Sequence, residues 1–297
     1  MIVCVHKKTP KDIMNETSNR CTPEELLLTI GQPGISVVDA SYASVTGATK
    51  HKADVRVQYQ RAHLPGAVFF DIDGICDKHS DLPHMLPSPE VFSAAVGEIG
   101  IANDHEVVVY DTTGLYSTAR VWWMFKVFGH KRVRILDGGL PAWLEAGGVL
   151  ESTESQFTPT NYSATFDSAL VANKHHLFEN CQHGKTVVLD ARSAGRFVGD
   201  EPEPRVGLPS GHMPYAKSLP FDRLIDKGRL RSITELKKTF EALELNESSS
   251  VITSCGSGIT AAIITLALSE AGYGMQRLYD GSWSEWASAT DTVILKG

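Results

Sequence analysis

A cysteine near the carboxyl end of the chain stands in the sequence context of a reactive nucleophile. The apolar, β-branched run Val251–Ser254 leads directly into Cys255-Gly-Ser-Gly258, and a helical pattern starts at about Thr260. Glycines adopt backbone angles closed to other residues, so this loop can turn its N–H groups inward as an anion site at a helix N-terminus. Such a site favours a thiolate, or a persulfide anion, over a thiol. The alternative, a buried structural cysteine before a glycine turn, lacks a reason for the Gly-x-Gly loop.

Two arginines offer a second kind of chemistry. Arg196 and Arg205 lie in one segment rich in Gly and Pro, which predicts a loop. Guanidinium groups bind a carboxylate and an adjacent carbonyl through paired hydrogen bonds, which lysine cannot do. The alternative is that these arginines form surface ion pairs with Glu201 or Glu203. The residues by themselves leave the two interpretations equally open.

Composition narrows the function classes. The chain has 297 residues, 42% of them hydrophobic and 21% charged, and a net charge of -7. This is an ordinary globular balance with about two domains. The negative charge argues against nucleic acid or an anionic membrane as the main partner. The five cysteines are scattered without a C-x-x-C pair, which indicates reduced thiols and neither a disulfide framework nor a metal site.

An internal repeat sets the domain organisation. Four blocks recur in the same order: Val37–Ser41 as Val188–Arg192, His63–Ala67 as His212–Ala216, Val107–Asp111 as Val251–Cys255, and Asp137–Trp143 as Asp280–Trp286. We therefore expect two copies of one domain. The division predicted is an N-terminal extension over 1–20, domains over 21–150 and 169–297, and a polar linker over 151–168.

Within each copy, short strand patterns alternate with helical ones. Strands are predicted at Val37–Asp39, Val107–Tyr110, Val133–Leu136, Thr186–Asp190 and Val251–Ser254, and helices from Pro23 and over Ala261–Ala271. This alternation predicts an α/β fold with a parallel sheet flanked by helices in each copy. Cys255 would then lie at the carboxyl edge of the second sheet, where such folds bind ligands.

Longer motifs carry a family resemblance over nearly the whole chain from about Thr22. They are His63–Asp73, His84–Pro87, Gly195–Phe197, Glu201–Arg205, Cys255–Ala261 and Tyr279–Trp286. In these motifs the chain resembles the tandem-domain rhodanese family, and within it the sulfurtransferases that act on 3-mercaptopyruvate. Sibling thiosulfate sulfurtransferases carry Arg and Lys after the cysteine, where this chain has Gly256 and Ser257.

The resemblance implies roles for individual residues. Asp73, His84 and Ser257 would form a relay with the catalytic Cys255, although which of His84 and Ser257 moves the proton stays open. Arg196 and Arg205 would bind the substrate carboxylate and ketone. The remaining substrate-binding positions expected are Gly256, Gly258, Ile259 and Thr260. The first copy has Asp111 in place of the cysteine, and since a carboxylate cannot form a persulfide, that copy is expected to be catalytically silent.

The implied reaction is transfer of sulfur from 3-mercaptopyruvate to a thiol acceptor through a Cys255 persulfide, with release of pyruvate. Thioredoxin or a small thiol is the expected acceptor, and hydrogen sulfide a product. No cofactor, metal, nucleic acid or membrane is expected. The expected state is a monomer or weak dimer, in the cytoplasm or the mitochondrion.

Three alternatives are open to test. A thiosulfate sulfurtransferase would use the same persulfide with another donor. A cysteine phosphatase needs an arginine after the cysteine loop, where this chain has Ala261. A non-enzymatic sulfur carrier has no need of the full set of site residues. We expect structural roles for His63, His212, Trp122, Trp123, Trp143 and Trp286, and no catalytic role for Cys4, Cys21, Cys76 and Cys181.

Overall fold

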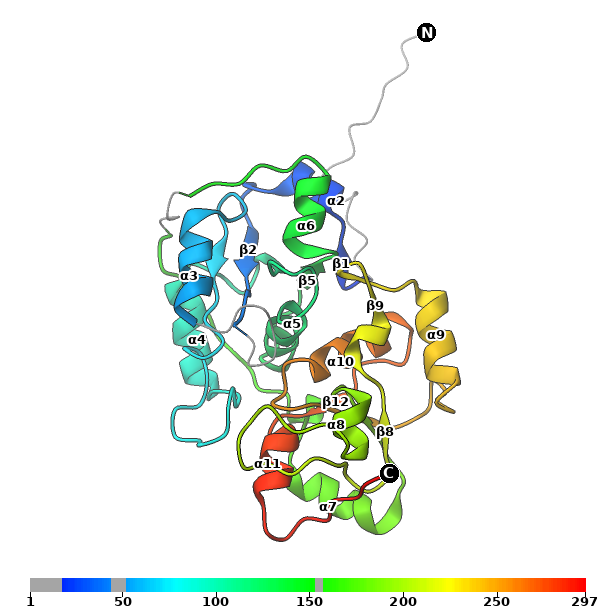
Figure 1. Cartoon of the computed structure of the whole chain (residues 1–297). Coiled ribbons are helices and arrows are strands. Elements are labelled where there is room, and N and C mark those ends of the chain that lie inside the picture. Colours follow the sequence, from blue (N-terminus) through cyan, green and yellow to red (C-terminus); the bar gives the residue numbers. More distant parts are fainter. Residues whose placement is uncertain (1–17, 44–51, 153–156) are drawn as a thin grey trace.

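The computed structural model describes residues 18–43, 52–152 and 157–297, and these form two stacked α/β halves (Figure 1). The first half contains a sheet of five parallel strands in the order β1-β5-β4-β2-β3. Its elements are β1 (Arg20–Cys21), α2 (Pro23–Thr29), β2 (Ile35–Asp39), α3 (Lys52–Arg61), β3 (Val68–Phe69), α4 (Pro89–Glu98), β4 (Glu106–Tyr110), α5 (Thr118–Val127), β5 (Val133–Leu136) and α6 (Gly139–Glu145).

The second half repeats this plan, with five parallel strands in the equivalent order β6-β12-β11-β7-β8. Its elements are η1 (Ser168–Leu170), β6 (Val171–Ala172), α7 (Lys174–His183), β7 (Val187–Asp190), α8 (Ala194–Val198), β8 (Ala216–Ser218), η2 (Phe221–Leu224), β9 (Ile225–Asp226), β10 (Arg229–Leu230), α9 (Ile233–Glu241), β11 (Val251–Ser254), α10 (Ala261–Glu270), β12 (Arg277–Tyr279) and α11 (Ser282–Ser288). β9 and β10 form a separate antiparallel pair.

Local sequence explains the elements that were predicted. The β-branched runs become central strands because they are buried on both faces between helices. The helix predicted from Pro23 starts there, capped by the Thr22 side chain and by a reciprocal bond from Glu25. The predicted fold class and all five predicted strands are confirmed, with ends that differ by no more than the usual few residues.

Repeat-related residues have matching structural roles in the two halves. His63 and His212 each form an isolated β-bridge, with Glu151 and Leu295 respectively. The indole N–H groups of Trp143 and Trp286 each donate to a backbone carbonyl shortly after their helix, at 2.8 and 3.0 Å. These contacts confirm the structural roles predicted for the paired residues.

The edges of the first domain differ from the sequence division. Arg20 belongs to β1 and its guanidinium pairs with Glu270 of α10 at 2.9 Å, so it lies inside the fold and not in the extension. The remaining expected extension up to residue 17, which includes Cys4, lies outside the described residues. After residue 156, the predicted linker runs along the first domain, with Thr160 N–H donating to the Gly97 carbonyl at 2.9 Å and Tyr162 buried.

The two halves meet through helices α5 and α10, which lie side by side between the two sheets (Figure 1). All residues of α5 except Lys126 are buried, including both Trp122 and Trp123. One continuous apolar core therefore extends across both halves. Packing of this kind makes the halves a single unit and not two domains joined by a hinge.

A buried ion pair crosses this interface. Arg120 of α5 has no exposed surface, and its guanidinium lies 2.7 Å from Asp280 Oδ1, which belongs to the loop between β12 and α11. The same guanidinium stacks on the Trp123 ring at 4.6 Å. The other Asp280 oxygen accepts the Leu86 N–H at 2.8 Å. A desolvated charge with several partners fixes the relative position of the elements that supply them.

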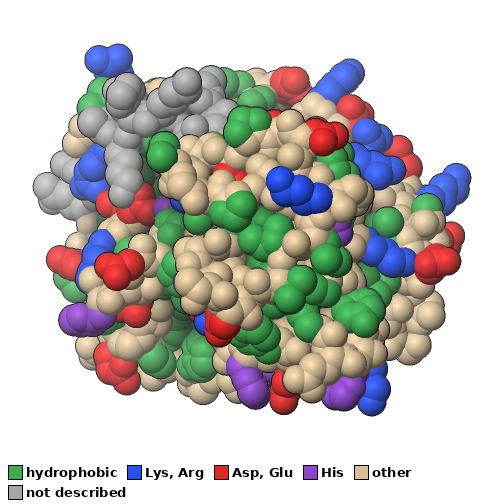
Figure 2. Space-filling view, turned by 60° about the horizontal axis from the view of Figure 1, so that its bottom comes forward, with side chains coloured by type: hydrophobic (Ala, Val, Ile, Leu, Met, Phe, Trp, Pro, Cys, Tyr) green, Lys and Arg blue, Asp and Glu red, His purple; other side chains and the backbone are tan. Residues whose placement is uncertain are grey.

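The surface carries charged side chains of both signs, as the overall composition indicates. On the face drawn in Figure 2, acidic and basic side chains are interspersed. Among the described residues, no helix combines the length and apolar character needed to cross a bilayer.

We predict that Arg120→Met destabilises the protein by about 3–5 kcal/mol, because it leaves Asp280 as an uncompensated buried charge. Urea unfolding of Arg120→Met, Asp280→Asn and the double variant measures the coupling. The double variant should lose clearly less stability than the sum of the two single variants. Arg231→Met, which removes an exposed pair with Glu235, is the control and should cost less than about 1 kcal/mol. If the losses of stability in the two single variants simply add in the double variant, Arg120 and Asp280 do not form a coupled ion pair.

Candidate active site

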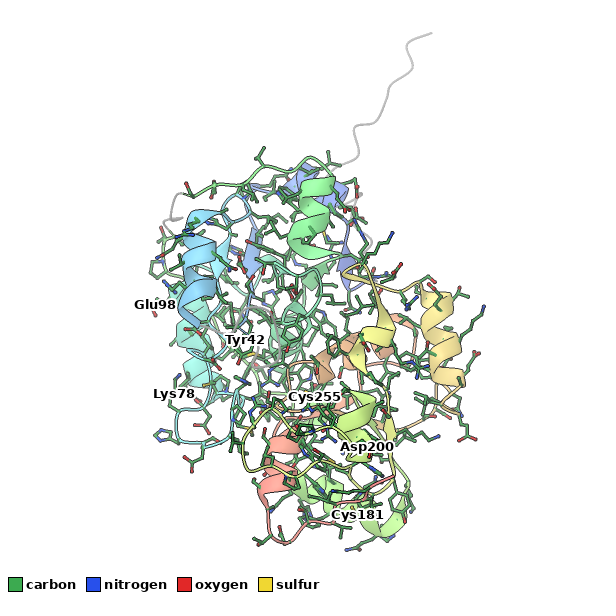
Figure 3. The ribbon with its side chains drawn as sticks, in the orientation of Figure 1. Tyr42, Lys78, Glu98, Cys181, Asp200 and Cys255 are labelled. Carbon is green, nitrogen blue, oxygen red and sulfur yellow. The ribbon has the colours of Figure 1, made fainter. Side chains whose placement is uncertain are left out.

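A cavity of about 260 Å³ opens at the carboxyl edge of the second sheet, where that half faces the first. Cys255 follows β11, the central strand, and lines the cavity together with residues of both halves. Figure 3 shows Cys255 and Tyr42 close to the boundary between the halves, whereas Cys181 lies at the far end of the second. The residues that line the cavity include Tyr42, His84, Tyr116, Arg192, Arg196, Glu201, Arg205, Cys255, Gly256, Ser257, Ile259 and Thr260.

The loop after β11 directs a backbone donor at the sulfur. The Gly258 N–H lies 3.1 Å from Cys255 Sγ and donates to it. Gly258 has a φ of 81°, and a Cβ there would lie 2.9 Å from Arg120 Nη1, so the position requires glycine. The Cys255 N–H donates to Ser282 Oγ at 3.2 Å, which fixes the base of the loop. One N–H of the predicted anion cradle, that of Gly258, therefore reaches this sulfur.

The first half shows what such a loop binds. Asp111 occupies the position of Cys255 after β4, and its carboxylate accepts five backbone N–H groups and two hydroxyls from the loop that follows. The donors are Thr113, Gly114, Tyr116, Ser117 and Thr118, at 2.7 to 3.1 Å. A repeat-related loop thus folds around a negative group that its own strand supplies.

Both predicted arginines reach this cavity. Arg196 is held by Glu203, with its Nη2 2.5 Å from Glu203 Oε2. The other Glu203 oxygen binds Arg192, which also pairs with Asp190. Within the described part of the chain, Arg205 has no carboxylate at ion-pair distance. The structure thus combines the two interpretations open from the sequence: Arg196 is in an ion pair, yet both arginines line the cavity.

Gly256 lies directly under these two guanidinium groups. A Cβ at this position would be 3.2 Å from Arg196 Nη2 and 3.6 Å from Arg205 Nη1. A long side chain here would have to displace both arginines. The absence of a side chain after Cys255 therefore brings the two cations next to the sulfur loop.

His84 reaches the cavity from the first half and is held on both ring nitrogens. Its Nδ1 lies 2.5 Å from Asp73 Oδ1, and its Nε2 lies 3.1 Å from the Tyr42 hydroxyl. Its backbone has a φ of 60°, a strained conformation, and the Arg120 guanidinium donates to its carbonyl at 2.5 Å. Burial lowers the pKa of His84, while the hydrogen bond and charge of Asp73 oppose that shift.

The other predicted loop residues divide into two groups. Gly256, Ser257, Ile259 and Thr260 line the cavity, whereas Gly258 is not among the lining residues and donates its N–H to the Cys255 sulfur. Ser257 is buried, and among the described residues no hydrogen bond joins its hydroxyl to His84. Tyr42 takes that position on Nε2.

The described cysteines other than Cys255 lie away from the cavity lining. Burial raises the pKa of Cys21 to about 12 and also raises the pKa of Cys181, so neither favours a thiolate. The Cys76 thiol donates to the Asp73 carbonyl at 3.1 Å. In the described residues, no three His, Cys, Asp or Glu side chains are grouped as a metal site.

Several residues of this site were not found from the sequence. Tyr42 follows β2 at the carboxyl edge of the first sheet, whereas Cys255 follows β11 of the second, and the position of Tyr42 after a predicted strand was the one available signal. Arg192 and Glu203 lie in motifs that were noted, but their role in orienting Arg196 depends on side-chain contacts. Nothing in the sequence indicated a role for Arg120, because its partners His84 and Asp280 are distant from it in the chain.

Comparison with known protein families identifies both halves of the chain. The family model for the rhodanese-like domain matches residues 22–146 and 174–289. The chain belongs to the rhodanese family. Both halves of this rhodanese family member match the same model, as the internal repeat predicted.

Similar proteins are sulfurtransferases. A thiosulfate/3-mercaptopyruvate sulfurtransferase 2 of Arabidopsis thaliana is 41% identical over 90% of this chain and 83% of its own length. The human 3-mercaptopyruvate sulfurtransferase is 40% identical over 90% of each chain. The crystal structure of SseA from Escherichia coli, described with the fold and mechanism of 3-mercaptopyruvate sulfotransferases, superposes with a TM-score of 0.81 at 34% identity over 90% of this chain and 99% of that one.

We predict that the pKa of His84 lies below the ordinary histidine value of about 6.5, and that Asp73→Asn lowers it further. Burial disfavours the charged ring, and the substitution removes the carboxylate that supports it. NMR titration of the labelled imidazole measures both values, with His84→Gln to assign the signal. A rise of the pKa in Asp73→Asn would contradict the geometry described.

Proposed function

We propose that this chain is a sulfurtransferase that moves the sulfur of 3-mercaptopyruvate to a thiol acceptor through a persulfide on Cys255 and releases pyruvate. The observation that carries the proposal is the meeting of two guanidinium groups and a cradled cysteine sulfur around Gly256. A substrate with a sulfur at one end and a keto acid at the other presents complementary groups to both.

The cavity supports each stage of this reaction. The Cys255 thiolate attacks the substrate sulfur, and the loop N–H groups stabilise the persulfide anion that results. Arg196 and Arg205 bind the carboxylate and ketone, and stabilise the enolate as its charge develops. Asp73 and His84 handle the proton that the pyruvate carbon gains. A second thiol then takes the outer sulfur, so that the kinetics are ping-pong.

Thiosulfate is the alternative donor, since the relatives include proteins named for both donors and a thiosulfate sulfurtransferase of Cricetulus griseus is 41% identical over 86% of this chain. The keto acid is favoured because Gly256 and Ser257 bring no cation of their own, and the two arginines beside Gly256 can bind a carboxylate. The experiment that tests the proposal is pyruvate release from 3-mercaptopyruvate with a small thiol present, compared with sulfite release from thiosulfate by their kcat/KM values.

The proposal includes one active site per chain, a thiol acceptor, an assembly state and a compartment. One active site per chain follows from Asp111, whose carboxylate fills its own loop in the first half. For the acceptor we keep thioredoxin or a small thiol, with hydrogen sulfide as a product, and for the assembly a monomer or weak dimer. For the compartment we keep the cytoplasm or the mitochondrion; one relative from Arabidopsis thaliana, 39% identical, is named as mitochondrial.

We predict that incubation with 3-mercaptopyruvate alone adds about 32 Da, one sulfur atom, at Cys255. Intact-mass analysis and peptide mapping locate the adduct. Cys255→Ser should lose sulfur transfer entirely and change the free energy of unfolding by no more than about 1 kcal/mol. A gain at Cys21, Cys76 or Cys181, or transfer by the serine variant, would reject the nucleophile.

We predict that Arg205→Met lowers kcat/KM for 3-mercaptopyruvate by about 30- to 160-fold, the value of a lost charged hydrogen bond of about 2–3 kcal/mol. Arg196→Met should act in the same direction. The loss for thiosulfate should be smaller, since that donor has no carboxylate. Arg223→Met, which removes an exposed arginine outside the cavity lining, is the matched control. Equal losses with both donors would remove the role as carboxylate ligands.

A further inference from the structure

We propose that Tyr42 is a catalytic residue of this site, the group that carries the proton between the substrate and His84. The inference rests on the function proposed above and deepens it. The Tyr42 hydroxyl lies 3.1 Å from His84 Nε2, and the two rings meet edge to face at 5.1 Å and 82°. Tyr42 lines the same cavity as Cys255, as its place in Figure 3 indicates.

Asp73 and Tyr42 together determine the direction of the two hydrogen bonds that His84 makes. A carboxylate can only accept, so the Asp73 contact at 2.5 Å places the proton of His84 on Nδ1. Burial lowers the pKa of His84, which keeps the ring neutral and leaves Nε2 as an acceptor. Burial also raises the pKa of the Tyr42 phenol, which therefore retains its proton. Tyr42 donates to His84, and its oxygen lone pairs are left for a ligand in the cavity.

Tyr42 is better placed than Ser257 for this task. Both side chains line the cavity, but in the described part of the chain only the tyrosine hydroxyl is hydrogen-bonded to His84. Because Nε2 of His84 is already bonded to the phenol, Tyr42 is the cavity-lining group through which that nitrogen would exchange a proton with a substrate. A proton that leaves the substrate reaches His84 through the phenol oxygen.

The step balances without any further reactant. The Cys255 thiolate forms an S–S bond with the substrate sulfur while the C–S bond breaks, and its electron pair passes to the methylene carbon as the enolate of pyruvate. The proton of the substrate thiol moves to the Tyr42 oxygen as the Tyr42 proton moves to His84 Nε2, forming an imidazolium beside Asp73. The proton then returns by the same path to the carbon, which becomes a methyl group. The two sulfurs are oxidised to the persulfide level, and the carbon is reduced.

The persulfide is left as an anion and pyruvate departs, so the relay transfers one proton from sulfur to carbon and ends as it began. Thiosulfate makes no such demand, because sulfite leaves without a new bond from carbon to hydrogen. If Tyr42 acts in a proton relay, its loss should slow the reaction of 3-mercaptopyruvate and not that of thiosulfate. If Tyr42 has only a general role in the cavity, its loss should slow both reactions.

The decisive experiment is single-turnover pyruvate release by Tyr42→Phe. We expect the rate to fall about 10²-fold, the usual contribution of a positioned proton-transfer group, with KM changed by less than about threefold. Sulfur loading of Cys255 from thiosulfate should stay within about twofold of wild type. Tyr215→Phe, at an exposed tyrosine outside the cavity lining, is the matched control and should leave pyruvate release unchanged.

A double variant tests whether Tyr42 acts through His84. If the two residues form one relay, Tyr42→Phe combined with His84→Gln should be no slower than the slower single variant. Multiplied losses would show that the residues act independently and would overturn the relay. If Tyr42→Phe fails to fold, Tyr42→His and Tyr42→Leu are compared instead, because only the histidine retains an exchangeable ring proton. Equal rates of pyruvate release by these two variants would also overturn the relay.

The outcomes for the relay and for the proposed function are distinct. A wild-type protein that releases no pyruvate from 3-mercaptopyruvate rejects the proposed function. A wild-type protein that releases pyruvate, with a Tyr42→Phe variant equally fast, rejects Tyr42 alone and leaves the sulfurtransferase proposal intact.

Discussion

The contact between Arg120 and Asp280 is the constraint on which the site depends, because the site is assembled from two halves. Arg120 belongs to the first half and Asp280 to the second, and their groups are desolvated between Trp123 and the cysteine loop. The same guanidinium donates to the carbonyl of His84 and lies against Gly258. One buried cation thus sets the position of the histidine and of the loop that holds the nucleophile. Neither half has the cysteine, the histidine and both arginines by itself.

Duplication explains how this division arose in physical terms. In each half the central strand ends in a loop whose backbone N–H donates to the side chain at the start of that loop. The type of this side chain differs between the two halves. Asp111 satisfies its loop with its own carboxylate, which closes the loop and leaves no room for a ligand. Cys255 has no charged oxygens to offer, and its loop remains open to a cavity. The first half then contributes Tyr42, Asp73 and His84 to a site that the second half completes.

The parts of the structure that sequence could predict are those encoded by neighbouring residues. The strand and glycine loop around Cys255, the capped helix at Pro23 and the repeated blocks are local patterns, and the structure follows them closely. The contacts between Tyr42 and His84, or between Arg120 and Asp280, join residues distant in sequence and leave no periodic signal. For the same reason the ion pair of Arg20 with Glu270 was not foreseen, and the first domain starts earlier than its sequence pattern indicates.

The crowding at Gly256 has an evolutionary consequence. Arg196 and Arg205 approach the space that a side chain at position 256 would enter, so a long cationic residue there would meet two like charges. The loop and these two arginines are therefore coupled positions. A change of donor preference in descendants of this sequence would be expected to involve the loop and the arginines together.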